Sequence, residues 1–261
     1  MGRKGRYVNI ATMIEKQKRI VKVKDQVMNA VESYGHEIGM NLVYQFGKLL
    51  HNGEVEGLGL KKLIQAGNIK VPSTTCIFNM GSATDCPSLS LGLCKATIPD
   101  GKGGFKSICY ASKSEKSYRP DVLPYRRRQE EFWKSVSPEQ WSAQFLLINS
   151  IRKNKFDKVR FNESGDFWSQ DCVRKAESIA RILFKFGITC YCYTSRSDLD
   201  FSNVRKLIIN GSSFKKKGIV NEFVMVRKDE VPPKGYGKCA SDCKVCNRCS
   251  IRGKKTYVLE H

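Results

Sequence analysis

Residues 158–193 read KVRFNESGDFWSQDCVRKAESIARILFKFGITCYCY and predict one β-α-β unit. The runs at 158–162 and 188–193 are predicted to be strands, and the segment between them has helical periodicity. Ser169 is placed to cap that helix and Gly187 to end it. Two such strands joined by a helix run parallel, with a right-handed crossover. The residues expected on the buried helix face are Val173, Ala176, Ala180 and Leu183.

Polar residues follow both strands of this unit. Parallel sheets place their ligand sites at the carboxyl ends of the strands, so we expect these loops to meet at one site. The expected cofactor-binding residues are Glu163, Ser164, Gly165, Asp166, Thr194 and Ser195. Asp166 and Arg196 are the candidate catalytic residues, as contacts to a cofactor or substrate. In the alternative interpretation, Asp166 only hydrogen-bonds the next backbone and Arg196 makes a surface ion pair.

The rest of the core continues the α/β pattern. A short helix is expected to end at Asn210-Gly211, and an apolar run predicts a strand at 219–226. Helices are predicted at 121–134 and from Ser137, and we expect one or two of the arginines 126–128 to contact a phosphate or a carboxylate. The fold class is α/β: a partial (β/α) barrel or an open parallel sheet, with a basic helical N-terminal segment and a cysteine-rich C-terminal metal-binding segment.

Three parts are predicted: a basic helical segment at 1–70, an α/β core at 71–230 that includes the first cysteine region, and a cysteine-rich segment at 231–261. In the first part, residues 1–30 carry eight Lys or Arg and two acidic residues. Two apolar stripes indicate two helices there. Their members are Ile14, Val21 and Met28, and then Met40, Val43, Phe46 and Leu50. The segment is either an arm that faces nucleic acid or a solvated helical hairpin.

The last part contains four cysteines within eleven residues, which are Cys239, Cys243, Cys246 and Cys249. Cysteines this close do not pair in disulfides without strain, but they suit a 4Fe–4S cluster or a zinc ion. One tight run, rather than two separated Cys-x-x-Cys knuckles, favours iron–sulfur. The first three also have the spacing of radical S-adenosylmethionine (SAM) enzymes, in which three sulfurs leave one iron open. In the alternative, Cys249 completes a fully ligated cluster or zinc site.

A second group consists of Cys86, Cys94 and Cys109, in a region punctuated by glycine and proline. Three ligands are what an open, cofactor-binding cluster requires. Two alternatives remain: the group shares one site with the terminal cysteines, or its members are buried thiols. Cys76 lies in an apolar stretch and is expected to pack as a buried thiol.

Composition indicates the partner and the compartment. The net charge is +21, from 46 basic and 25 acidic side chains, which favours a nucleic-acid partner over a neutral metabolite. A general solubility effect is the alternative. Eleven cysteines fit metal ligation in a reducing compartment better than disulfides. Since no apolar run approaches the ~20 residues of a membrane span, we expect a cytoplasmic protein without a membrane partner.

In this order, several short motifs resemble the phage "gene product 88" family over residues 72–250. The motifs are Ser82-Ala83-Thr84-Asp85-Cys86-Pro87, Cys94, Cys109-Tyr110-Ala111, Arg126-Arg127-Arg128, residues 159–167, residues 191–197 and the terminal cysteines. The family occurs in phages and mobile elements and is similar to radical-SAM proteins in its cysteines and strands.

The resemblance implies an iron–sulfur protein of a virus or mobile element, inside the host cell, that acts on or binds nucleic acid. Cys86, Cys94 and Cys109 would hold an open 4Fe–4S cluster that takes S-adenosylmethionine, and the terminal cysteines an auxiliary cluster. The alternative is a DNA- or RNA-binding protein without catalysis, in which iron–sulfur or zinc only stabilises the fold.

Overall fold

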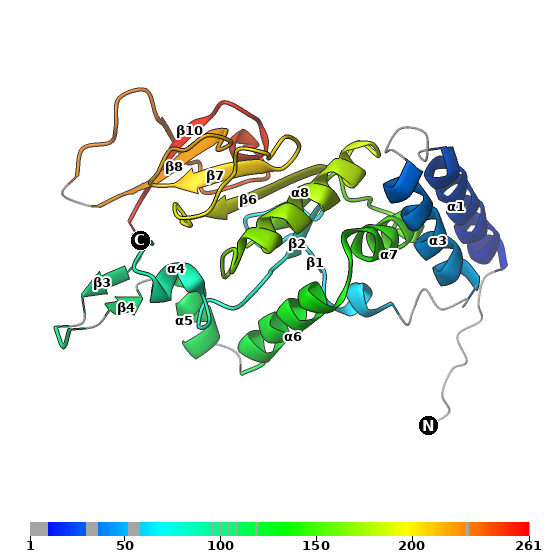
Figure 1. The fold of residues 1–261 in the computed structure, drawn as a ribbon, viewed down its shortest axis with the longest axis horizontal. Helices are drawn as coiled ribbons and strands as arrows, with labels where there is room; N and C mark the ends of the chain where they lie inside the picture. The colour runs from blue at the N-terminus through cyan, green and yellow to red at the C-terminus, as the bar shows by residue number, and fades with distance from the viewer. Residues whose placement is uncertain are drawn as a thin grey trace. The chain divides into compact units, whose positions relative to one another are not determined.

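A computed structural model gives the fold of the chain (Figure 1). It describes residues 10–29, 36–51, 58–94, 97–99, 101–103, 105–107, 109–117, 120–227 and 230–260. The chain divides into two compact units: Met1–Lys61 with Glu139–Lys155, and Lys62–Pro138 with Phe156–His261. The three-part division expected from the sequence stays a prediction. Across the described residues, no helix combines the length and the apolar character needed to cross a membrane.

The first unit is helical, as predicted. It contains α1 (Ile10–Asn29), α3 (His36–His51) and nearly all of α7 (Pro138–Ile151). Helices α1 and α3 contact each other, and the buried side chains there are Val27, Leu42 and Phe46. In α7, Trp141, Phe145 and Ile148 are buried.

The apolar stripe that indicated α1 is not the buried face of that helix. Ile14, Val21 and Met28 share a face, but each is about half exposed, and so is Met40 on α3. Two helices that contact each other bury only the side chains between them. Periodicity identifies residues that share a face, but it does not identify the face that finds a partner.

The second unit contains an eight-stranded sheet in the order β1-β2-β5-β6-β7-β8-β10-β9. All neighbours are parallel except β1 and β2, and β1 and β9 are the two edges, so the sheet is open and not a closed barrel. The strands are β1 (Gln65–Ala66), β2 (Thr75–Phe78), β5 (Lys158–Phe161), β6 (Thr189–Thr194), β7 (Ile208–Ser212), β8 (Asn221–Val226), β9 (Gly237–Lys238) and β10 (Lys255–Leu259).

The β5-α8-β6 unit is confirmed. The Ser169 side chain accepts a hydrogen bond from the Cys172 amide and caps α8 (Gln170–Phe184), and the four predicted core residues of that helix are buried. On the same side of the sheet, Trp133 of α6 (Val122–Ser135) packs against Phe161. One predicted element is wrong: β7 lies where a short helix was expected to end at Asn210-Gly211. The β-branched pair Ile208-Ile209 is buried between β6 and β8 and therefore extends.

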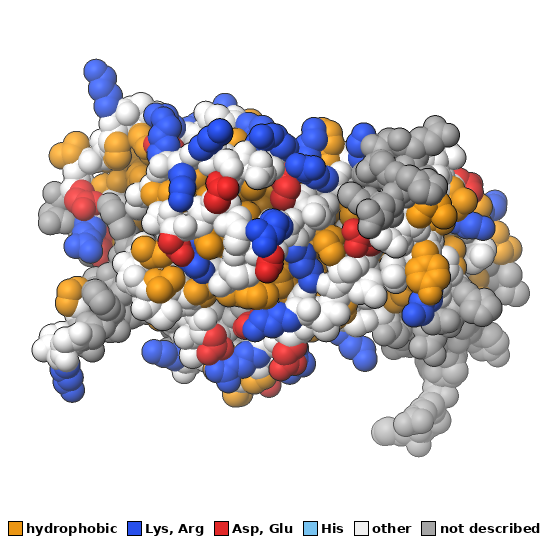
Figure 2. All heavy atoms as spheres, viewed as in Figure 1, with side chains coloured by type: hydrophobic (Ala, Val, Ile, Leu, Met, Phe, Trp, Pro, Cys, Tyr) orange, Lys and Arg blue, Asp and Glu red, His pale blue; other side chains and the backbone are white. Residues whose placement is uncertain are grey.

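The remaining elements are short. They are η1 (Gly59–Lys62), α4 (Pro87–Ser90), a hairpin of β3 (Thr97–Pro99) and β4 (Phe105–Ser107), α5 (Tyr110–Ser117) and η2 (Arg248–Ser250). Most of them lie in the glycine- and proline-rich region, η1 lies where the first unit passes into the second, and η2 lies near the end of the chain. Cys76 lies in β2 and is buried, as predicted. Figure 2 shows Lys and Arg side chains spread over the face that it draws.

Candidate functional site at the carboxyl edge of the sheet

The loops that follow β2 and β5 lie directly against each other. Gly165 has φ +72°, and a Cβ there would come within 2.7 Å of the Gly81 carbonyl oxygen, so only glycine fits. Asn162 is also left-handed, with φ 57°, and its side-chain oxygen accepts a hydrogen bond from the Met80 amide. The sequence Asn-Glu-Ser-Gly-Asp thus turns the chain sharply out of β5 and onto the loop after β2.

Asp166 joins three loops at this edge. One carboxylate oxygen accepts hydrogen bonds from the Ser88 hydroxyl (2.7 Å) and the Ser195 amide (2.8 Å), and the other accepts from the Phe167 amide (2.8 Å). The side chain is buried. Burial raises its pKa, and the hydrogen bonds from Thr194, Ser195 and Ser88 act against that rise. The predicted meeting of the two strand ends is confirmed, with Asp166 as the link between them.

Arg196 and Glu163 also have protein partners. Arg196 is buried, donates two hydrogen bonds to Asp198 (2.8 and 2.7 Å) and donates another to the Phe167 carbonyl. The ion pair of the alternative interpretation is therefore present, between a buried guanidinium and a carboxylate whose side chain is 42% exposed. Glu163 accepts from the Asn68 side chain at 2.5 Å. Contact of Asp166 or Arg196 with a cofactor or substrate stays a prediction.

Two of the upstream cysteines lie in the loop after β2. Cys86 precedes α4, and the Cys94 amide donates to the Ser88 carbonyl at 3.3 Å. Burial raises the pKa of the Cys86 thiol to about 12, and the nearby Asp166 and Cys94 contribute to that rise. Cys86 is therefore a neutral thiol in the protein alone. It lines a hollow of about 340 Å³ together with Thr84, Asp85, Leu89 and Ser90.

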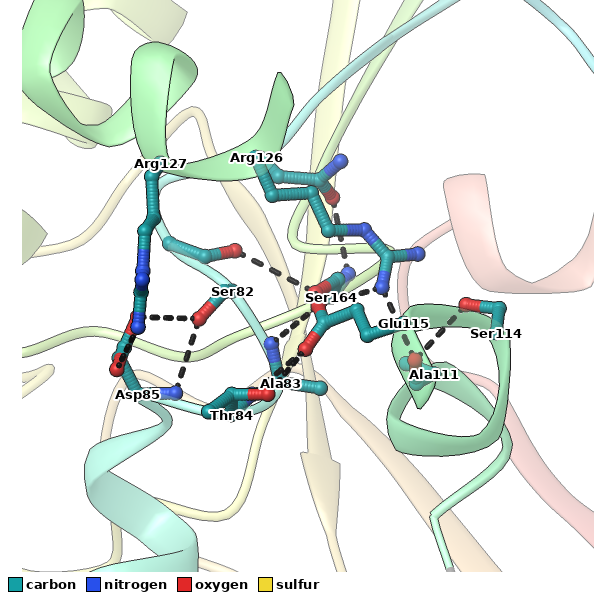
Figure 3. Close-up of polar contacts among 12 residues, drawn as sticks. Ser82, Ala83, Thr84, Asp85, Ala111, Ser114, Glu115, Arg126, Arg127 and Ser164 are labelled. Atoms are coloured by element: carbon teal, nitrogen blue, oxygen red, sulfur yellow. Dashed lines mark hydrogen bonds and ion pairs between the residues drawn. The ribbon is translucent and has the colours of Figure 1, made fainter. Parts of the chain in front are cut away.

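The third cysteine is positioned through Glu115 (Figure 3). Cys109 immediately precedes α5, and Glu115 of that helix accepts hydrogen bonds from the Ala83 and Thr84 amides, both at 2.8 Å, and from Arg126 at 2.7 Å. Burial opposes ionisation of Glu115, but these hydrogen bonds outweigh it and lower its pKa. Glu115 therefore ties α5 to the loop that carries Cys86.

Sequence reasoning missed Glu115, because nothing in the Lys- and Ser-rich helix marks it as a buried residue. It did predict that one or two of the three arginines contact a carboxylate. Arg126 binds Glu115, and Arg127 binds Asp85 through two hydrogen bonds of 2.9 and 3.1 Å (Figure 3).

The terminal cysteine run, defined as residues 239–249, lies across the other face of the sheet. The Cys239 amide donates to Tyr257 of β10, and the Cys243 amide donates to Lys70, in the connection between β1 and β2. Asn68, two residues before Lys70, donates a hydrogen bond to Glu163, which follows β5. The run therefore links β10 to the connection between β1 and β2.

Cys249 is held by three strands. Its carbonyl accepts hydrogen bonds from Asn210 of β7 (2.9 Å) and Asn221 of β8 (3.5 Å). Burial raises the pKa of its thiol to about 11, and a hydrogen bond from the Tyr193 hydroxyl of β6 acts against that rise. The Arg160 guanidinium lies 5.2 Å from the centre of the Tyr193 ring. The alternation Tyr191-Cys192-Tyr193 was the sequence signal for a polar second face, and sequence reasoning did not use it.

The two cysteine groups have different neighbours. Cys86 and Cys94 lie near Asp166, whereas Cys243 and Cys249 lie near Arg160. Within the described part of the chain, no three His, Cys, Asp or Glu side chains are arranged so as to hold a metal ion. Both ligand sets, and their sharing of one site, stay predictions.

These features define a class: an open and mostly parallel α/β sheet, with one cysteine group at its carboxyl edge and a second on its other face. The chain belongs to the Gene product 88 family, a phage gene-product family, which matches residues 49–214. The matched range begins 23 residues before the expected range of 72–250 and ends 36 residues before the end of that range. It includes Cys86, Cys94, Cys109, Asp166 and Arg196, but not the terminal run. No curated protein and no solved structure matched the chain.

Proposed function

We propose that this chain is an iron–sulfur protein of a phage or mobile element, radical-SAM-like in its first cysteine group, that acts on or binds nucleic acid. One observation carries the proposal. Cys86 and Cys94 lie in the loop that directly follows β2, the first parallel strand of the sheet, and this loop packs at the carboxyl edge against Asp166. That edge is where parallel α/β sheets bind their ligands.

The proposed cluster would take its three ligands from the cysteines near the carboxyl edge. Cys86, Cys94 and Cys109 would be its ligands, and Glu115 fixes α5, which Cys109 precedes, to the loop that carries Cys86. A 4Fe–4S cluster with three protein ligands supplies one-electron chemistry and an open iron for S-adenosylmethionine. Glu163, Ser164, Gly165, Thr194 and Ser195 belong to the loops around the site. Asp166 and Arg196 hold these loops in position.

The terminal run supports a second, auxiliary metal centre. None of the described residues between Glu230 and Lys255 is buried, so this segment has no apolar core of its own. Small segments without a core are commonly held by a metal, whose binding free energy then contributes to folding. Cys239, Cys243, Cys246 and Cys249 would supply the thiolates.

A basic patch supports the nucleic-acid part of the proposal. Arg181, Arg205, Lys206 and Arg252 gather near the carboxyl end of α8. Arg252 donates to the Arg205 carbonyl, Arg181 lies near Asn203, and the Lys206 ammonium lies 3.8 Å from the centre of the Phe184 ring. Phe184 is half exposed. Cations around an exposed aromatic ring suit phosphates and a stacked base.

The alternative is a DNA- or RNA-binding protein in which iron–sulfur or zinc only stabilises the fold. The observation that favours it is that both candidate catalytic residues already have hydrogen-bond partners within the protein. Asp166 accepts hydrogen bonds from Ser88, Ser195 and Phe167, and Arg196 is paired with Asp198.

Reductive cleavage of S-adenosylmethionine distinguishes the two functions. Protein prepared anaerobically and reconstituted with iron and sulfide is reduced and incubated with S-adenosylmethionine. The radical-SAM-like proposal predicts cleavage by the wild type that is abolished in Cys86→Ser. Cys190→Ala, which removes a thiol buried in β6, is the matched control and should keep cleavage. A protein that binds iron and sulfide without cleaving S-adenosylmethionine supports the alternative, and one that binds only zinc removes the radical-SAM-like proposal.

A further inference from the structure

Trp168 differs from the other two tryptophans of the chain. It is 37% exposed, whereas Trp133 and Trp141 are fully buried. It follows Asp166 and Phe167 in the loop after β5, so its indole lies at the carboxyl edge of the sheet. A large aromatic ring left open to solvent at a ligand-binding edge is a surface on which a planar ligand can stack.

Cations line the same part of the edge. The Lys134 ammonium lies 5.1 Å from the centre of the Trp168 ring and is paired with Glu130 at 2.6 Å. Arg127, Glu130 and Lys134 are three and four residues apart on α6 and share one face of it. A Cβ at Gly81 would come within 3.4 Å of the Glu130 carboxylate, so this face of α6 lies against the loop after β2.

Arg127 is available to an incoming anion. It is paired with Asp85, but both side chains are substantially exposed, at 51% and 40%. Exposed ion pairs contribute little to stability, so a phosphate can replace Asp85 at the guanidinium without a large loss. Guanidinium groups bind phosphate through two parallel hydrogen bonds.

Asp85 also connects this cationic face to the hollow. It lines the hollow of about 340 Å³ together with Thr84, Cys86, Leu89 and Ser90. Ligand pockets start at about 300 Å³, so the hollow accommodates one small planar group with its substituents. The edge therefore combines an open indole, two cations and a concave surface.

We propose that Trp168, Arg127 and Lys134 form a nucleotide subsite beside the hollow, with a nucleobase stacked on the indole and its phosphate on the two cations. This inference rests on the nucleic-acid partner proposed above and names the place where one nucleotide of a strand binds. A single strand fits better than a duplex, because the bases of a duplex are already stacked on each other.

The tryptophan fluorescence of the full chain reports on this subsite. Since the other two tryptophans are buried, acrylamide quenches mainly Trp168. A mixed-sequence single-stranded DNA oligonucleotide should reduce that quenching, and an equal amount of duplex should reduce it much less. Deoxyadenosine monophosphate is the third probe. If it protects Trp168 and the oligonucleotide does not, the ligand is a free nucleotide, and the nucleobase–phosphate subsite stands.

Variants give the matching affinities, measured by anisotropy of a labelled oligonucleotide. Trp168→Ala should weaken binding by about fivefold or more, the range expected for loss of one stacked base. Arg127→Gln should weaken it and also reduce the protection of Trp168, whereas Lys234→Gln, at an exposed lysine far along the chain, should leave that protection unchanged. Trp168→Phe keeps a stacking ring and should retain most of the affinity.

Two failures are distinguishable. If the oligonucleotide binds with the same affinity to wild type and Trp168→Ala, and Trp168 is not protected, the subsite is wrong while the nucleic-acid partner stands. If the wild type binds no oligonucleotide and no mononucleotide, both the partner and the subsite are wrong.

Discussion

The two cysteine regions of the molecule are held by opposite means. The loop after β2, which carries Cys86 and Cys94, is tied by a backbone amide and two hydroxyls to the buried carboxylates of Glu115 and Asp166. The terminal run has backbone hydrogen bonds to both ends of the sheet but no buried residue. The first region is stabilised by these buried hydrogen bonds without a metal. Under the proposed function, the second region depends on the metal that its thiols would bind.

The largest effect should come from removal of the metal that we propose for the terminal run. In segments that do not fold alone, the binding of a structural metal contributes about 10 kcal/mol or more to the free energy of folding. This segment lacks an apolar core. Chelation or Cys243→Ser should therefore release the run, while β5, α8 and β6 stay folded. Hydrogen exchange should show much faster exchange of the Cys239 and Cys243 amides. Unchanged exchange after complete metal removal contradicts the comparison.

Removal of the Glu115 carboxylate should break the upstream loop. The Glu115 side chain is fully buried and paired with Arg126, and loss of one partner of a buried ion pair costs about 3–5 kcal/mol. We expect Glu115→Ala to lower the free energy of unfolding by about that amount in urea titrations. Glu131→Ala, an exposed carboxylate on α6, is the control and should change it little.

The two carboxylates should give opposite pH dependence. The pKa of Glu115 is lowered in the folded state, so its contribution is present above its ordinary value of 4.5 and is lost as the pH falls through the lower folded value. The pKa of Asp166 is raised, so its contribution is greatest at low pH and is lost as the pH rises from 3.8 through the raised value. Urea titrations should be made at several acidic pH values. In Glu115→Gln, the free energy of unfolding should fall less steeply than in wild type as the pH is lowered. In Asp166→Asn, the loss of stability that accompanies a rise in pH should be smaller than in wild type. If the two variants show the same pH dependence of the free energy of unfolding, the two carboxylates do not act in opposite directions.

A smaller effect is expected at Tyr193. Tyr193→Phe removes the hydroxyl that donates to Cys249 and keeps the ring under Arg160. A typical hydrogen bond contributes about 1 kcal/mol, so we expect a loss of that order, confined to the terminal run. Hydrogen exchange of that run measures it, and loss of stability throughout the sheet is the contrary result.

The smallest effect on stability should come from Arg127→Gln. The Arg127–Asp85 pair is exposed on both sides, and such pairs contribute about 0–1 kcal/mol. Thermal unfolding should be nearly unchanged. A loss as large as that of Glu115→Ala would mean that this pair, like the Arg126 pair, holds the loop.

The sequence predicted what depends on local pattern. The β5-α8-β6 unit was predictable because its periods, cap and stop lie within 36 consecutive residues. The convergence of Asp166 and Ser195 followed from the rule for parallel strands. Glu115 was not predictable, because its partners Ala83 and Arg126 come from separate segments. The contacts of Cys239 and Cys243 were not predictable either, because their partners Tyr257 and Lys70 lie in separate segments of the chain.

The measurement that tests the central claim most directly is the iron, sulfide and zinc content of anaerobically prepared protein. It should compare wild type, the double variant Cys239→Ser with Cys243→Ser, and the control Cys190→Ala. The account predicts bound metal in wild type and control, and selective loss from the double variant together with faster exchange of the terminal run. A wild-type protein without metal, whose terminal run is as well protected as β6, would contradict it.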